Sequence, residues 1–175
     1  MQYKGLRWFK CDLHLHSPAS KCFCDKSVTP IQWVQAVKEA KLDCIALTDH
    51  NTGEWIDKIK VECTNQGIIF FPGVEITCDS AKVHLLVIFD HNKDSQYVND
   101  FLIKCGIDRE KFADDTAHSQ KTVLQIIELA NKCHGIVIPA HIDEYNGIGY
   151  CCSSDSVNDF FDHKKNKHKC SSNCT

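Results

Sequence analysis

Two histidines lie two residues apart near the N-terminus, in the segment 11–17, which reads Cys-Asp-Leu-His-Leu-His-Ser. Alternate residues of a β-strand point to the same side, so His14 and His16 can reach one metal ion where a strand ends. Imidazole is the commonest protein ligand for transition metals. Because two surface histidines often share this spacing by chance, the pair needs support from the rest of the chain.

Three further apolar runs, 44–47, 68–74 and 136–138, also end in metal-binding side chains. The side chains at these ends are Asp49, His50, Glu75 and His141. In a parallel α/β sheet the carboxyl ends of the strands meet at one rim, where chemistry collects. Four such ends at one rim predict a metal site. A further candidate, His84, lies near the start of the apolar run 83–89 rather than at its end.

The candidate ligands are rich in imidazole, include two carboxylates and contain no thiol. They are His14, His16, Asp49, His50, Glu75, His84 and His141. This mixture suits Zn, Mn or Fe in a catalytic site better than a closed structural zinc site. The set exceeds the needs of one ion, and a bridging Glu75 would hold two ions roughly 3.5–4 Å apart. Such a pair predicts metal-dependent hydrolysis of phosphate esters, with Asp49 or His50 assisting proton transfer.

The pattern of apolar residues alternates between short strands and longer helices, which predicts an α/β fold with a largely parallel sheet. Expected strands cover 8–13, 44–47, 68–74, 83–89 and 136–138. One helix is expected from Pro30, after the N-cap Thr29. Others are expected over 54–66 and 119–133, with glycines after them as stops.

Taken together, these segments resemble the PHP (polymerase and histidinol phosphatase) domain family. The resemblance rests on five motifs in order: Asp12-Leu13-His14-Leu15-His16-Ser17, Leu47-Thr48-Asp49-His50-Asn51, Pro72-Gly73-Val74-Glu75-Ile76, Val83-His84-Leu85-Leu86 and Pro139-Ala140-His141. It implies a distorted (β/α)7 TIM-like barrel with two or three divalent metal ions at its C-terminal rim. It further implies that one ion is held by His14, His16 and Glu75, and that Glu75 bridges to a second ion near His84 and His141.

The chain also departs from the family pattern. The resemblance assigns His50 to a third ion, yet the stretch 17–25, where trinuclear members tend to carry a histidine, has Ser20, Lys21 and Cys22 instead. The closing Asp-x-His motif is missing, since Asp162 and His163 are adjacent. We therefore expect a binuclear or incomplete site, in a PHP domain that is incomplete at its C-terminus.

The opening segment 3–9 resembles PHP domains that precede an ATPase domain, so an ATPase domain is an expected neighbour in the parent protein. Two functions remain open. One is a phosphoesterase acting on a phosphorylated small molecule or a nucleic-acid end. The other is a catalytically impaired metal-binding module with a structural or regulatory role beside another domain.

The 175 residues are expected to form one domain over 1–150 and a polar tail over 151–175. With a net charge of -3, no signal peptide and no long apolar stretch, we expect a cytoplasmic protein without membrane contact. Most cysteines before the tail are interpreted as small core residues. The tail has three open interpretations: a flexible end, a basic run at 164–169 that touches nucleic acid, or a zinc knuckle. The zinc knuckle would use His163, His168, Cys170 and Cys174.

Overall fold

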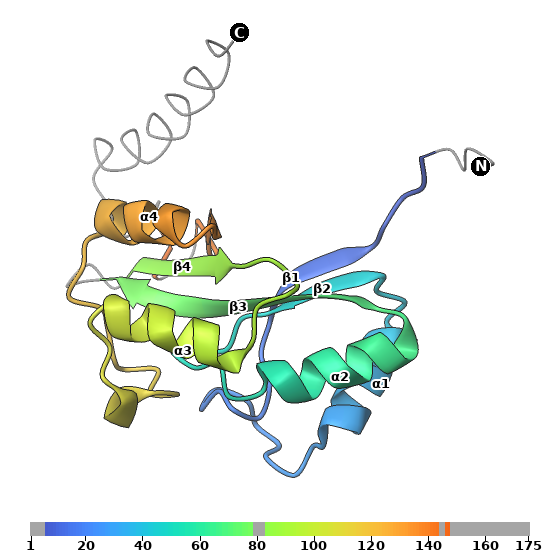
Figure 1. Cartoon of the computed structure of the whole chain (residues 1–175). Coiled ribbons are helices and arrows are strands. Elements are labelled where there is room, and N and C mark those ends of the chain that lie inside the picture. Colours follow the sequence, from blue (N-terminus) through green and yellow to red (C-terminus); the bar gives the residue numbers. More distant parts are fainter. Residues whose placement is uncertain (1–5, 79–82, 144–145, 148–175) are drawn as a thin grey trace, which may run out of the picture.

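A five-stranded sheet organises the protein, which is described by a computed structural model over residues 6–78, 83–143 and 146–147. The strand order is β1-β2-β3-β4-β5. The strands are β1 (Cys11–Leu15), β2 (Cys44–Leu47), β3 (Ile69–Cys78), β4 (Val83–Ile88) and β5 (Ile136–Pro139). The sheet curls like half of a barrel (Figure 1). The α/β class is confirmed, and the sheet is consistent with an incomplete barrel.

Strand direction explains the position of His84. Strands β1, β2 and β3 run parallel, whereas β4 is antiparallel to both β3 and β5. Four strands therefore point the same way, in keeping with the expected largely parallel sheet, and β4 alone is reversed. Only four residues separate β3 from β4, too few for the crossover that a parallel pair needs. Because β4 is reversed, its start, with His84, lies at the rim where the other strands end.

In the described part of the chain, four α-helices and one 3-10 turn accompany the sheet. They are α1 (Pro30–Glu39), α2 (Ile56–Gln66), α3 (Ser95–Lys104), the turn η1 (Arg109–Lys111) and α4 (Val123–Lys132). The capping box of Thr29 and Gln32 starts α1 as expected. A second capping box, Thr122 with Gln125, starts α4 at Val123 rather than at the predicted residue 119. Helix α2 ends at Gly67, whose φ of 70° suits a residue without a Cβ.

Other boundaries also differ from the sequence-based prediction. Strand β1 begins at Cys11 rather than at residue 8, because its pairing with β2 begins at Cys11 and Cys44. Strand β3 continues to Cys78, since β4 pairs along it as far as that residue. Helix α2 begins two residues later than expected, and α3 and η1 were not predicted.

The core lies between the sheet and the helices. Helices α2 and α3 pack against β3, α1 packs against α2, and α4 packs against β5. Fully buried core side chains include Ile45, Leu85 and Phe101. Cys63 and Cys105 are also fully buried and form no disulfide, as the interpretation of core thiols predicts. The tail 151–175 and its proposed zinc-knuckle residues lie outside the described residues. Among the helices that the structure describes, none has the length and apolar character needed to cross a membrane.

Replacing Ile59 with alanine should destabilise the fold, because this α2 side chain is 0% exposed and its loss leaves a cavity. The expected loss in the free energy of unfolding is about 2–5 kcal/mol, measured by urea denaturation. Val61→Ala on the same helix is the control, since Val61 is 58% exposed. It should change stability by less than about 0.5 kcal/mol. Equal losses in the two variants would contradict the described packing of α2.

Candidate metal centre

Backbone hydrogen bonds bring the segment after β2 against Glu75 in the middle of β3. The Glu75 amide donates to the carbonyl of Asp49 at 3.1 Å, and the Asn51 amide donates to the carbonyl of Glu75 at 3.0 Å. His50 therefore sits beside Glu75 as an isolated parallel bridge. On the other side, β4 pairs His84 with Thr77, two residues beyond Glu75. The sheet thus delivers both histidines to the same carboxylate.

The Glu75 carboxylate is 1% exposed and meets imidazoles at both of its oxygens. Oε2 lies 2.9 Å from His14 Nε2, 3.2 Å from His16 Nε2 and 3.5 Å from His50 Nδ1. Oε1 lies 2.8 Å from His84 Nδ1 and 3.2 Å from His141 Nε2. The structure therefore gathers five of the seven predicted ligands around a sixth, the Glu75 carboxylate.

The spacing of these atoms fits metal coordination. His14 Nε2, His16 Nε2 and Glu75 Oε2 lie 2.9–3.3 Å from one another. Ligand atoms bound about 2.1 Å from one ion lie roughly 3.0–3.4 Å apart in octahedral or tetrahedral geometry. Among the described residues, the buried atoms His50 Nδ1 and His141 Nδ1 have no hydrogen-bond partner. The unsatisfied His50 Nδ1 lies 3.5 Å from Glu75 Oε2, where a cation would satisfy it, so the cluster is capable of holding a metal.

Charge pairing governs the protonation of the cluster. Burial alone would raise the pKa of Glu75, but hydrogen bonds from His14, His16 and His84 outweigh burial and hold this pKa well below its ordinary value. The hydrogen bond to Glu75 raises the pKa of His14, against an opposing effect of desolvation. Desolvation lowers the pKa of His50 to about 4, so its imidazole is neutral at neutral pH. A neutral imidazole keeps the lone pair that metal binding requires.

The seventh predicted ligand, Asp49, lies beside the cluster, with its carboxylate already engaged. It accepts hydrogen bonds from the Ser17 amide at 2.6 Å, the Ser17 hydroxyl at 2.5 Å and the Ser20 hydroxyl at 2.8 Å. Its closest approach to His16 is 4.0 Å, to Nδ1. Asp49 thus fixes the loop after β1 against the end of β2. The predicted metal and proton-transfer roles of Asp49 remain predictions.

The Ser20 hydroxyl orients the ring of His16. Its single hydrogen goes to Asp49, and its oxygen accepts from the His50 amide at 2.9 Å. His16 Nδ1, 3.2 Å from the same oxygen, must therefore carry a proton and donate it. The other ring nitrogen of His16, Nε2, then faces Glu75 and His14.

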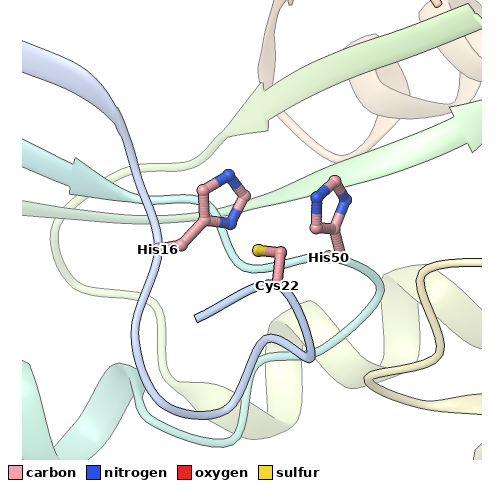
Figure 2. A group of neighbouring side chains, drawn as sticks. All are labelled: His16, Cys22 and His50. Carbon is pink, nitrogen blue, oxygen red and sulfur yellow. The ribbon is translucent and has the colours of Figure 1, made fainter. Parts of the chain in front are cut away.

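One residue near the cluster was not predicted as a ligand. The sulfur of Cys22 and one nitrogen each of His16 and His50 all lie within 4.8 Å of one another. Figure 2 shows the Cys22 side chain directed toward the gap between the two imidazoles. Desolvation raises the pKa of this thiol, with Ser20 opposing the rise. The sequence contains Cys22, but only the folded loop shows that it reaches His50.

Comparison with known protein families agrees with this geometry. The model of the PHP domain family matches residues 12–162, which include every histidine of the cluster and Glu75. The chain belongs to the PHP domain family. A comparison with curated proteins finds no match.

Solved structures similar to this PHP domain include a candidate metal-dependent phosphoesterase from Bifidobacterium adolescentis. It has 14% identity and a TM-score of 0.63, with 87% of this chain and 74% of that chain covered. A two-domain protein from Bacteroides vulgatus, with a predicted PHP-like metal-dependent phosphoesterase, has 23% identity and a TM-score of 0.48, over 74% of this chain and 34% of that one. A Chromobacterium violaceum amidohydrolase has 25% identity and a TM-score of 0.45, over 58% and 34%. The similarity to the Bifidobacterium adolescentis structure supports the fold described above.

The depressed pKa of His50 predicts how stability depends on pH in the metal-free protein. Between pH about 4 and 6.5, unfolded His50 binds a proton that folded His50 does not, so stability falls as pH falls through this window. The His50 contribution is at most about 3 kcal/mol. Urea denaturation with a chelator should show a shallower pH dependence for His50→Gln than for the wild type. Parallel curves for the two proteins would contradict the assignment.

Proposed function

We propose that the protein is a metal-dependent phosphoesterase that hydrolyses a phosphomonoester or the end of a nucleic-acid strand. The observation that carries this proposal is the Glu75 carboxylate, whose two oxygens face separate imidazole pairs. A carboxylate placed in this way would, together with these imidazoles, hold two divalent ions such as Zn, Mn or Fe. When bound, such ions supply Lewis-acid catalysis of phosphate-ester hydrolysis.

The protein's own residues take distinct roles in this proposal. His14 and His16 would bind a metal ion on the Oε2 side of Glu75. His84 and His141 would bind a metal ion on the Oε1 side. The remaining imidazole, that of His50, is neutral, and its Nδ1 faces Glu75 Oε2 without a hydrogen-bond partner among the described residues. It can accept a proton or bind metal.

Asp49 acts in this proposal by positioning. Its carboxylate holds the loop after β1 through Ser17 and Ser20, and three hydrogen bonds leave it poorly placed to reach a substrate. We also propose that an ATPase domain is a neighbour of this domain in the parent protein. This part of the proposal rests on the resemblance of the opening segment 3–9.

Glu75→Gln should lower kcat/KM by about a hundredfold or more, because the amide lacks the charge that binds and bridges divalent ions. The assay uses chelator-treated protein reloaded with Mn or Zn, with an aryl phosphate and a short oligonucleotide as substrates. Glu54→Gln is the matched control, since the Glu54 side chain is 63% exposed and pairs only with Lys58 among the described residues. Metal content is measured for each variant.

Two outcomes contradict the proposal. If wild-type protein and Glu75→Gln bind metal equally, the cluster is not the metal site. If the wild type binds metal tightly, loses melting temperature with chelator and hydrolyses neither substrate, the chain is a catalytically impaired metal-binding module.

A further inference from the structure

Two cysteines lie side by side where β1 and β2 begin, away from the strand ends that build the metal cluster. Cys11 is the first residue of β1, Cys44 is the first residue of β2, and the two are partners in the parallel pairing of these neighbouring strands (Figure 1). Paired residues of parallel strands stand about 4.8 Å apart and point to the same face. Both cysteines are free thiols, and their side chains are in hydrogen-bonding contact.

The residues directly before the two cysteines fix their relative position. The Lys10 amide donates to the Asp43 carboxylate at 2.8 Å, and the Asp43 amide donates to the Lys10 carbonyl at 2.8 Å. The Cys44 amide donates to the same carbonyl at 3.3 Å. This reciprocal pairing sets the register at the start of both strands, so the two thiols are held opposite each other.

The two thiols differ in their access to solvent. Cys11 is exposed, whereas Cys44 is 8% exposed. Burial raises the pKa of Cys44 to about 11, with the neighbouring Cys11 thiol adding to the rise. A reagent in solution therefore meets Cys11 first, and Cys44 is placed to react with the sulfur of Cys11 afterwards.

We propose that Cys11 and Cys44 are a redox modification site, which a low-molecular-weight disulfide converts into a reversible disulfide between β1 and β2. In the first step the Cys11 thiol loses its proton and its sulfur attacks one sulfur of the reagent. The bond between the reagent's sulfurs breaks, and one thiol leaves with that proton. In the second step the Cys44 sulfur attacks the Cys11 sulfur, and its proton goes to the second leaving thiol. Two protein thiols are oxidised and one reagent disulfide is reduced to two thiols.

Strand spacing makes this disulfide possible and also easy to reduce. A separation of about 4.8 Å between paired Cα atoms lies within the range of roughly 4.4–6.8 Å that disulfides span. The Cβ atoms of a disulfide stand about 3.8 Å apart, closer than the side chains of paired residues in parallel strands. The bond must therefore draw β1 and β2 together, and strained disulfides are the ones that thiols reduce readily.

The disulfide would fasten the strand that the described sheet holds least. Strand β1 is an outer strand, paired only with β2 among the described strands. Its burial is also partial, since none of its residues is fully buried, whereas every residue of β2 is. A covalent bond from Cys11 to Cys44 adds to the hydrogen bonds of this single pairing. The inference is independent of the reaction that the metal cluster performs.

Peptide mapping of the full chain tests the proposal. Trypsin releases Cys11 in peptide 11–21 and Cys44 in peptide 42–58, each as the single cysteine of its peptide. After treatment with oxidised glutathione and blocking of free thiols, mass spectrometry should find these two peptides linked. The link should disappear in millimolar reduced glutathione. If Cys11 instead carries a stable glutathione adduct with no link to Cys44, or if the link survives reduced glutathione, the proposal is wrong.

Two matched variants separate a paired site from general thiol oxidation. Cys11→Ser should leave Cys44 as an unmodified thiol, because its access to the reagent is through Cys11. Cys24→Ser removes another exposed cysteine, on the loop after β1, and should leave the link between peptides 11–21 and 42–58 unchanged. Glutathione modification of Cys44 in Cys11→Ser at the rate seen for Cys11 in the wild type would overturn the order of the two steps.

Hydrogen exchange tests the effect of the disulfide on β1. Oxidation should slow exchange of the β1 amides about tenfold or more, because opening of this strand then leaves its first residue attached to β2. Helix α4 is the internal control and should exchange at the same rate in both forms. Equal exchange of β1 in the oxidised and reduced proteins would overturn the fastening of this strand.

Discussion

The burial of one carboxylate among five imidazoles is the constraint on which the candidate site depends. Glu75 is 1% exposed, so its charge has lost its hydration and must be compensated by the surrounding protein. The histidines that compensate it come from the other four strands of the sheet or the segments directly after them. Curvature of the sheet, strand register and the loop conformations after β2 and β5 all serve to bring these rings to the carboxylate. A divalent cation at this position would replace the protons that otherwise balance the charge.

Much of this site could be predicted from sequence, because the strands that end at one rim reveal themselves by apolar runs followed by His, Asp or Glu. The placement of His84 could not be obtained from that rule, which assumes parallel strands. Its explanation was nevertheless present in the sequence, since the eight residues between the expected strands 68–74 and 83–89 are too few to connect two parallel strands. Helix α3 was also recoverable in principle. Asp94 caps it, and Val98, Phe101 and Leu102 have helical spacing.

The supporting interactions were beyond sequence reasoning for a different reason. Asp49 follows a buried strand as a metal ligand would, and only the folded loop shows its carboxylate occupied by Ser17 and Ser20. The same loop gives Ser20 its role in fixing the tautomer of His16, and brings Cys22 to His50. Hydrogen-bond partners between residues about 30 positions apart depend on loop conformation, for which residue type and spacing carry little information.

The strand order has a consequence for folding. Within the described sheet, β1 and β5 are the outer strands, and Glu75 lies on the central strand between them. Glu75 and His84 are nine residues apart and meet across a local hairpin, whereas His14 and His141 are separated from Glu75 by 61 and 66 residues. Joining distant segments costs more loop-closure entropy than joining near ones. A bound metal would therefore act as a late cross-link that ties both outer strands to a preformed hairpin.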